Sequence, residues 1–305
     1  MENKKFSIIT PSYNQGSFLE RCINSILDQE NVSVQHIIID GGSSDNTLNI
    51  LKKFDSHVAK WIHEEDNGQT DAINKGWKHA TSKFINWLNA DDTLMPDSLD
   101  IVKEAFNKFD AHVVCGYSKL IWPDGKTILK RSSKVISNFA QFIAEGQIMQ
   151  PSTFWRKEVF DKFFPLPTKL NFMMDHFLWL QYISQFSCEK IMYINDVLAE
   201  VKMHPEAKSV KQLQLFDRER ELIFRDLFAS YNSNKSKAEF RGFVPSNHKI
   251  KESLSEIKFY LTYDRIFLRD EFGKKTGIRQ DHLRRSFVNY PFKTIAQGLK
   301  NLVRQ

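Results

Sequence analysis

Short apolar runs alternate with stretches of helical spacing over the first 116 residues. The apolar runs are rich in branched and aromatic residues and lie at residues 6–10, 36–40, 58–62 and 84–88. Apolar positions with helical spacing lie between them, at residues 18–27, 47–54 and 70–80. Continuous apolar runs are typical of strands buried on both faces. The alternation predicts right-handed βαβ units and a mostly parallel sheet, which is an α/β fold.

The pattern changes after residue 116. A turn signal, Pro-Asp-Gly-Lys at residues 123–126, lies inside a stretch at 118–130 and predicts a hairpin. Helical spacing is expected at 154–164 and 175–186, and strands at 191–201. From residue 211 onward the pattern is helical and strongly charged. We therefore divide the chain into residues 1–116, 117–210 and 211–305, the last being a helical basic extension.

Composition limits the class of protein. The chain has 305 residues, of which 41% are apolar, enough for a sizeable core. No run approaches the roughly 18 apolar residues of a membrane-spanning helix. The N-terminus leads at once into a strand pattern, which leaves no room for a signal peptide. Three scattered cysteines suggest buried thiols in a reducing cytosol, and the expected location is cytoplasmic.

Positive charge is concentrated in the tail. Residues 274–305 hold eight Lys or Arg against one acid, a balance of +7, whereas the whole chain carries +6, so the rest carries −1. Within this tail, residues 292–303 have amphipathic helical spacing. Such a helix either packs on the body or lies on an anionic membrane, here the inner face of the cell membrane. The tail lacks the interleaved aromatic and basic residues of a single-strand nucleic-acid groove, so no nucleic acid is expected as a partner.

Polar motifs follow the predicted strands of the first half. They occupy residues 10–14, 40–47, 67–76 and 88–92. Since the carboxyl ends of parallel strands lie at one edge of a sheet, these motifs should converge where α/β proteins bind nucleotides.

Two adjacent carboxylates, Asp91 and Asp92, directly follow the fourth apolar run. A carboxylate pair at a strand end attracts a divalent cation, and the cation attracts phosphate. On this segment alone, capping of the helix expected after residues 95–98 is an equal alternative.

These motifs resemble those of family-2 glycosyltransferases, the inverting type with the GT-A fold. The resemblance covers roughly residues 5–210 and leaves the tail outside. It rests on Ile-Ile-Thr-Pro-Ser-Tyr-Asn (8–14), Ile-Asp-Gly-Gly-Ser-Ser-Asp-Asn-Thr (39–47), Asn-Gly-Gln-Thr-Asp-Ala-Ile-Asn-Lys-Gly (67–76), Leu-Asn-Ala-Asp-Asp (88–92), Gln-Pro-Ser-Thr-Phe-Trp-Arg-Lys (150–157), Met-Asp-His-Phe-Leu-Trp (174–179) and Lys-Met-His (202–204). It implies a Rossmann-like GT-A domain whose half 1–116 binds a nucleotide-sugar donor and whose half 117–210 binds the acceptor.

The resemblance implies how the base and the metal are held. Asp40 resembles the carboxylate that hydrogen-bonds uracil or an equivalent base, and Pro11 and Tyr13 resemble the wall beside it. Asp91 resembles the acid that coordinates Mg²⁺ or Mn²⁺ bridged to the donor diphosphate, where the metal neutralises charge on the leaving group. His204 resembles a histidine that completes the metal or pyrophosphate site, with a plain surface histidine as the alternative.

Other donor-side positions follow the same motifs with one departure. The usual first carboxylate of the metal motif is Asn89 here, followed by Ala90. The Asn89 amide oxygen can accept a ribose hydroxyl but brings no charge, so metal affinity is expected to be lower. Asp92 could still serve as a cap. Asp71 either contacts the donor or caps a helix, and Asp45 is expected to be a turn or cap residue.

Asp175 resembles the family's catalytic base, an acid that precedes Leu-Trp. Direct displacement at the anomeric carbon needs a base that takes the proton of the acceptor hydroxyl. The alternative is an acid that favours the start of a helix. The whole pattern predicts an inverting enzyme that moves a sugar from a nucleotide diphosphate, expected to be UDP, to a glycan or lipid-linked glycan in polysaccharide biosynthesis. The alternatives are a transferase onto polyprenyl phosphate and a non-catalytic nucleotide-sugar-binding or scaffold protein.

Overall fold

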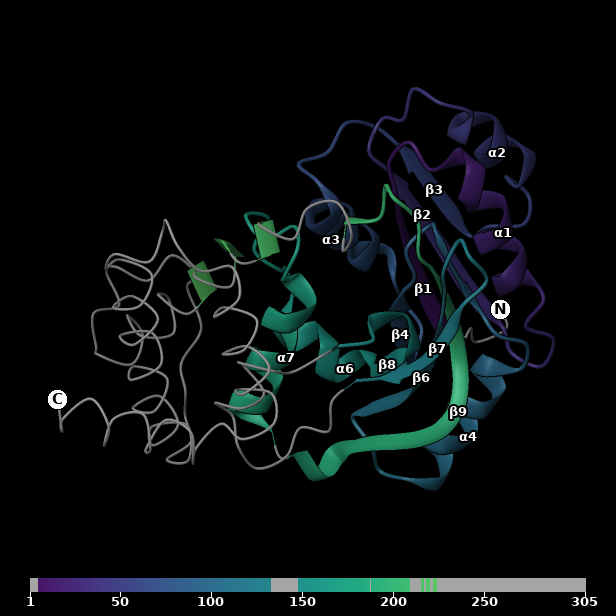
Figure 1. The fold of residues 1–305 in the computed structure, drawn as a ribbon. Coiled ribbons are helices and arrows are strands. Elements are labelled where there is room, and N and C mark those ends of the chain that lie inside the picture. The colour runs from purple at the N-terminus through teal and green to yellow at the C-terminus, as the bar shows by residue number, and fades with distance from the viewer. Residues whose placement is uncertain are drawn as a thin grey trace, which may run out of the picture.

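The computed structural model describes residues 5–132, 148–186 and 188–208, together with residues 215, 216, 218, 219, 222 and 223. These residues form a mixed nine-stranded sheet with helices on its faces (Figure 1). The α/β fold class predicted from the sequence is confirmed. The basic tail 274–305 and most of the extension from residue 211 lie outside the described residues, and their predicted helices stay predictions.

The first half is a parallel sheet in the order β3-β2-β1-β4. Its strands are β1 (Phe6–Ser12), β2 (Val34–Asp40), β3 (Lys60–His63) and β4 (Phe84–Trp87). The helices between them are α1 (Gly16–Leu27), α2 (Thr47–Lys53) and α3 (Gln69–His79). The predicted alternation of strand and helix is therefore confirmed in this half.

Helices cover both faces of these strands, which explains their continuous apolar runs. Ile38 of β2 packs in a cluster with Leu19 of α1 and Ile50 of α2. Its neighbours Ile37 and Ile39 point to the other face, where α3 packs. Figure 1 shows α1 and α2 on one side of the sheet and α3 on the other. Because successive side chains of a strand point to opposite faces, each face needs its own apolar residues.

The second half mixes strand directions. After β4 the sheet continues as β8-β6-β9-β5, with β7 also paired to β6. Its strands are β5 (Asp92–Leu94), β6 (Val113–Ile121), β7 (Thr127–Arg131), β8 (Thr153–Arg156) and β9 (Ile191–Lys202). Its helices are α4 (Ser98–Lys108), α6 (Lys157–Phe160) and α7 (Met174–Gln185), with short 3-10 turns η1 (Gln150–Ser152), η2 (Asp161–Phe163) and η3 (Cys188–Lys190). Strand β6 runs across residues 116 and 117, so the two predicted halves share one sheet.

One helix prediction in this half is wrong at its start, although its later residues 157–163 do form α6 and η2, and two other elements are confirmed. The stretch 154–164, expected to be helical, begins as strand β8, which lies antiparallel between β4 and β6. Phe154 and Trp155 are both buried there, so their apolar character does not reveal a helix period. The β6–β7 hairpin forms as predicted, with Gly125 at φ +82° in its turn. Helix α7 also forms close to its predicted bounds.

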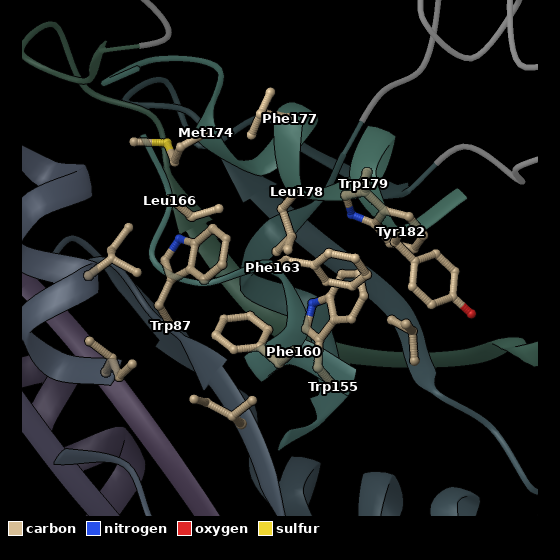
Figure 2. Close-up of a cluster of buried hydrophobic side chains, with 14 of the residues drawn as sticks. Trp87, Trp155, Phe160, Phe163, Leu166, Met174, Phe177, Leu178, Trp179 and Tyr182 are labelled. Carbon is tan, nitrogen blue, oxygen red and sulfur yellow. The ribbon is translucent and has the colours of Figure 1, made fainter. Parts of the chain in front are cut away.

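An aromatic cluster holds α7 against the sheet (Figure 2). Trp155 of β8 lies with its ring centroid 5.1 Å from Trp179 and 5.3 Å from Tyr182, both on α7. Phe160 stacks on Phe164 with 4.2 Å between ring centroids. All of the aromatic side chains that Figure 2 labels are buried, so the position of α7 is set by apolar packing.

Within the described part of the chain, no helix combines the length and the apolar character needed to cross a bilayer.

Candidate functional site

The carboxyl ends of β1, β2 and β3 lie level with one another, and β4 ends beside Ile9 of β1. Ser12 pairs in register with Asp40, and Asp40 with His63. Two residues in the loops that follow have left-handed backbone, Asn14 at φ 53° and Gly42 at φ 78°. The polar motifs predicted to converge at this sheet edge therefore do so.

Asp40 is fully buried at the end of β2. Its carboxylate accepts hydrogen bonds from the Ser43 backbone N (2.9 Å) and Oγ (2.5 Å), and its Oδ2 lies 2.6 Å from His63 Nδ1. Pro11 is buried beside it in β1, whereas Tyr13 is 63% exposed. The predicted base-binding residues thus comprise a buried carboxylate and an exposed aromatic ring, and Tyr13 directly follows Ser12, the partner of Asp40 in the sheet.

Asp91 and His204 are brought together although 113 positions separate them. His204 Nε2 lies 3.1 Å from Asp91 Oδ2, and their side chains are only 10% and 17% exposed. The His204 ring also stacks on Phe18, with 4.7 Å between centroids. His204 is therefore not a freely exposed surface side chain, and its role at a metal stays a prediction. A carboxylate oxygen facing an imidazole nitrogen suits Mn²⁺, and the oxygen alone suits Mg²⁺.

Asn89 is already engaged by protein groups. Its Oδ1 accepts a hydrogen bond from Gln69 Nε2 at 2.7 Å, and its Nδ2 donates to Asp92 Oδ2 at 3.2 Å. Ala90 is buried directly after it. The amide oxygen expected to face a ribose hydroxyl therefore faces the first residue of α3 in this structure.

The suggestion that Asp92 caps a helix is wrong. Asp92 is buried in strand β5, paired with Val201, and α4 begins only at Ser98. Burial, with Asp91 next to it, raises the pKa of Asp92 well above its usual value. Since burial penalises the charged form, the protonated form of Asp92 is favoured at this position.

Two further acids hold loops. Asp45 accepts hydrogen bonds from the Gly16 backbone N (2.9 Å) and the Thr47 backbone N (3.0 Å), so it caps as expected. Asp71, in the first turn of α3, accepts from the Asn67 backbone N at 3.1 Å. This hydrogen bond agrees with the alternative in which Asp71 caps the start of α3. Contact between Asp71 and the donor stays a prediction.

Asp175 lies in the first turn of α7. Its Oδ1 accepts a hydrogen bond from the His176 backbone N at 2.7 Å. Loss of surrounding water raises the pKa of this partly buried carboxyl to about 6. Such a group is a proton acceptor near neutral pH, as a general base requires.

The loop before α7 is joined to the strand-end loops. The Asn171 side chain accepts a hydrogen bond from the Thr70 backbone N at 3.3 Å. Lys208 Nζ donates to the Asn171 carbonyl at 3.3 Å and to Gln69 Oε1 at 2.8 Å. Gln69 in turn donates a hydrogen bond to Asn89. Polar contacts therefore connect the strand-end loop that holds Asp91 to the loop that precedes α7 and Asp175.

Sequence reasoning missed several of these side chains. His63 ends a strand and could have been found by its place in the predicted sheet. Gln69 lies inside a recognised motif but was given no role. Lys208 follows His204 by four residues and carried no separate signal. Glu219, described below, lies in the region assigned only as a charged helical extension.

Comparisons with known proteins place this geometry in a family. The model of glycosyl transferase family 2 matches residues 7–177, more than half of the chain, and the chain belongs to that family of sugar-transferring enzymes. It is 29% identical over 212 residues to an uncharacterized glycosyltransferase of Nostoc, covering 66% of this chain and 65% of that protein. It is 35% identical over 98 residues to a putative teichuronic acid biosynthesis glycosyltransferase, TuaG, of Bacillus subtilis, covering 31% of this chain and 38% of that one.

Solved structures share the fold. The S. aureus TarS fragment 1–349 in complex with UDP-GlcNAc matches with a TM-score of 0.60 at 16% identity, over 88% of this chain and 76% of that one. The Pyrobaculum calidifontis mannosyltransferase PcManGT, in complex with GDP-Man and Mn²⁺, matches with a TM-score of 0.51 at 14% identity, over 99% of this chain and 88% of that one. These likenesses confirm the GT-A fold that the sequence motifs predicted.

Proposed function

We propose that this protein is an inverting glycosyltransferase that moves a sugar from a UDP-sugar to a hydroxyl of a glycan or lipid-linked glycan in polysaccharide assembly. The observation that carries the proposal is a chain of polar contacts through Gln69 and Lys208, which runs from Asn89, near the Asp91–His204 pair, to Asn171 in the loop before Asp175. The UDP-GlcNAc bound to TarS and the teichuronic acid named for TuaG support the donor and acceptor classes.

The proposed donor site uses the strand ends of residues 1–116. Pro11 and Tyr13 would flank the base, and Asp40, which is buried and bonded to Ser43 and His63, would bond the base once one of these partners gives way. Asn89 and Ala90 would face the ribose once a ribose hydroxyl replaces Gln69 on the Asn89 amide oxygen. Asp91 and His204 would hold Mn²⁺ or Mg²⁺, which neutralises charge on the departing diphosphate when bound. Within the described residues no group of three His, Cys, Asp or Glu side chains forms a metal cluster, so the donor phosphates would supply further ligands.

The proposed acceptor site lies in residues 117–210. Asp175 would accept the proton of the attacking hydroxyl, on the side of the sugar opposite the leaving diphosphate, which gives inversion in one step. Because the base must be ionised, and the pKa of Asp175 is raised to about 6, kcat should fall about tenfold per pH unit below that value and level off above it.

The direct test is release of nucleoside diphosphate from a panel of nucleotide sugars with glycan and lipid-glycan acceptors. Wild type should turn over, and Asp175→Asn should lower kcat by about 10²- to 10⁴-fold. Asp124→Asn, in the exposed β6–β7 turn, is the matched control and should act as wild type. Full activity of Asp175→Asn with a polyprenyl phosphate acceptor would identify that transferase instead, because its acceptor oxygen is already anionic. Tight donor binding with no turnover on any acceptor would indicate a binding protein.

The proposed setting is the cytoplasmic face of the cell membrane. The support is the excess of seven positive charges in residues 274–305, which would draw the protein to anionic lipid. Binding to vesicles of anionic lipid but not to DNA at matched salt would agree with this setting, and binding to DNA alone would contradict it.

A further inference from the structure

One buried carboxylate holds the backbone that leads into α7. Glu219, only 7% exposed, accepts hydrogen bonds from three successive backbone N–H groups. The N of Asn171 lies 2.7 Å from Oε1, and the N atoms of Phe172 and Met173 lie 2.8 and 2.9 Å from Oε2. Three charge-assisted bonds to one side chain fix a short segment of backbone firmly.

The held segment ends where α7 begins. Helix α7 starts at Met174, and Asp175 follows in its first turn. Fixing the peptide groups of residues 171–173 therefore fixes the direction in which the first turn, and the Asp175 carboxyl on it, leaves the loop. The same Asn171 is tied by its side chain and its carbonyl to Thr70 and Lys208, so the loop is held on both sides.

Glu219 reaches this loop from a part of the chain beyond the family match, which ends at residue 177. Residues close to Glu219 in the sequence also pack near the start of α7. Phe216 lies with its ring centroid 5.2 Å from that of Phe172. Ile223 is 2% exposed, and Leu222 packs on the aromatic cluster that supports α7.

We propose that Glu219 is a positioning residue for Asp175: its carboxylate clamps residues 171–173 and so sets where the proposed base stands and what charge it meets. This inference rests on the proposed function only for the role of Asp175 as base. A carboxylate is needed at this place because both of its oxygens accept, whereas a glutamine would turn an NH₂ group toward N–H donors.

Glu219 acts on Asp175 through its negative charge as well as through its hydrogen bonds to the loop. Burial is the main cause of the raised pKa of Asp175. The negative charge of Glu219 raises this pKa further, whereas the hydrogen bond from the His176 backbone N–H lowers it. Among the described residues, Glu219 is the ionisable side chain that contributes to this rise. Removing its charge while keeping its shape should therefore lower the Asp175 pKa.

Two variants separate the effect of the Glu219 hydrogen bonds from the effect of its charge. Glu219→Gln keeps the size and removes the charge, and Glu219→Asp keeps the charge and shortens the reach. Amide exchange of residues 171–173 should become about 10- to 100-fold faster in both variants, because bonds to a charged acceptor are lost. The pKa of Asp175, followed by NMR of labelled aspartate, should fall in Glu219→Gln and stay raised in Glu219→Asp. The control is Glu104→Gln, on the exposed face of α4, which should change neither readout.

Several outcomes overturn the inference. If amide exchange at residues 171–173 is unchanged in Glu219→Gln, Glu219 does not hold this segment. If the Asp175 pKa is unchanged in that variant, the charge of Glu219 does not act on Asp175. Loss of amide protection in β1 for both variants would make Glu219 a stabiliser of the whole chain instead of the α7 start.

Kinetics separate this inference from the proposed function. Glu219→Gln should lower kcat by about 10- to 100-fold with the donor KM unchanged, and the acidic limb of the pH profile should move to lower pH. If the amides open and the Asp175 pKa falls while Asp175→Asn keeps full activity, the clamp stands and the proposed function fails. If Asp175→Asn is inactive while Glu219→Gln equals wild type in kinetics and exchange, the proposed function stands and the clamp fails.

Discussion

The two ends of the site are held in different ways. At the ends of β1 to β4, functional groups are fixed by short polar contacts within and between the strand-end loops, such as Asp40 with Ser43 and Asn89 with Asp92, and Asp91 also meets the distant His204. At the start of α7, Asp175 is placed by an aromatic cluster and by contacts from distant residues, Thr70 and Glu219. The first region owes its geometry mainly to parallel strands that end at one edge of the sheet, and the second to packing over long sequence separations. Loss of packing should therefore damage the second region first.

The largest expected difference between the regions is in stability. Phe160 is fully buried among Trp87, Trp155 and Phe164, so Phe160→Ala should lower the free energy of unfolding by about 3–5 kcal/mol. Tyr13→Ala removes an exposed ring at the strand ends and should change it by less than about 0.5 kcal/mol. Urea denaturation of both variants tests this, and similar losses would contradict the contrast.

Asp175 should cost the folded protein stability at neutral pH. Its pKa is raised from 3.8 to about 6 in the folded state, so folding favours the protonated carboxyl, and stability is lost as pH rises from about 4 to 6. Asp175→Asn should accordingly be more stable than wild type by about 1–3 kcal/mol at pH 8, and equal to it near pH 3. Thermal unfolding across this pH range measures the difference, and a gain that is constant with pH would exclude ionisation as its cause.

At the donor end, neighbouring acids should behave unequally. Asp91→Asn removes the carboxylate that faces His204 and should weaken Mn²⁺-dependent binding of a UDP-sugar by about 10- to 100-fold. Asp92→Asn, which replaces a buried carboxyl whose pKa is raised, should change donor affinity by less than about threefold. Calorimetry with and without Mn²⁺ compares them, and an equal loss in both would argue that the pair acts as one ligand.

The smallest expected effect concerns Asn89. Asn89→Asp keeps the acceptor for Gln69 but replaces the donor to Asp92 with a charge, which should lower metal-free stability by about 1 kcal/mol. The added charge should also tighten Mn²⁺ binding. A thermal-shift titration with Mn²⁺ reads both changes, since a bound ligand stabilises by mass action. Weaker Mn²⁺ binding in this variant would show that Asn89 is better suited to the site than the acid.

Sequence reasoning reached the first region well because its signals are local. Each strand is a continuous apolar run, and each functional loop follows directly at its end, so Asp40 and Asp91 could be placed at one edge without coordinates. The His204 contact to Asp91 came from resemblance alone, since no local rule joins residues 113 positions apart.

Three features were predicted wrongly or not at all, each because the local sequence carries no signal for it. Strand β8 was taken for a helix because Phe154 and Trp155 are apolar on both faces of a central strand. Asp92 was given to a helix that begins six residues later, because a three-residue strand, β5, leaves no recognisable pattern. Glu219 gave no signal, because its partners are backbone N–H groups.

Strand β9 has a consequence for how this protein can be altered. It begins beside the α7 region, pairs with β6 along most of its length and with β5 near its end, and finishes two residues before His204. Its pairing with β6 shifts register between Cys115 and Ser118, and from Ala199 to Lys202 the strand is held in continuous register. A single inserted residue within it would turn every later side chain to the opposite face and carry His204 away from Asp91. The β6–β7 turn at Gly125, by contrast, should accept insertions, so exchange of acceptor-side segments between relatives must keep the length of β9 unchanged.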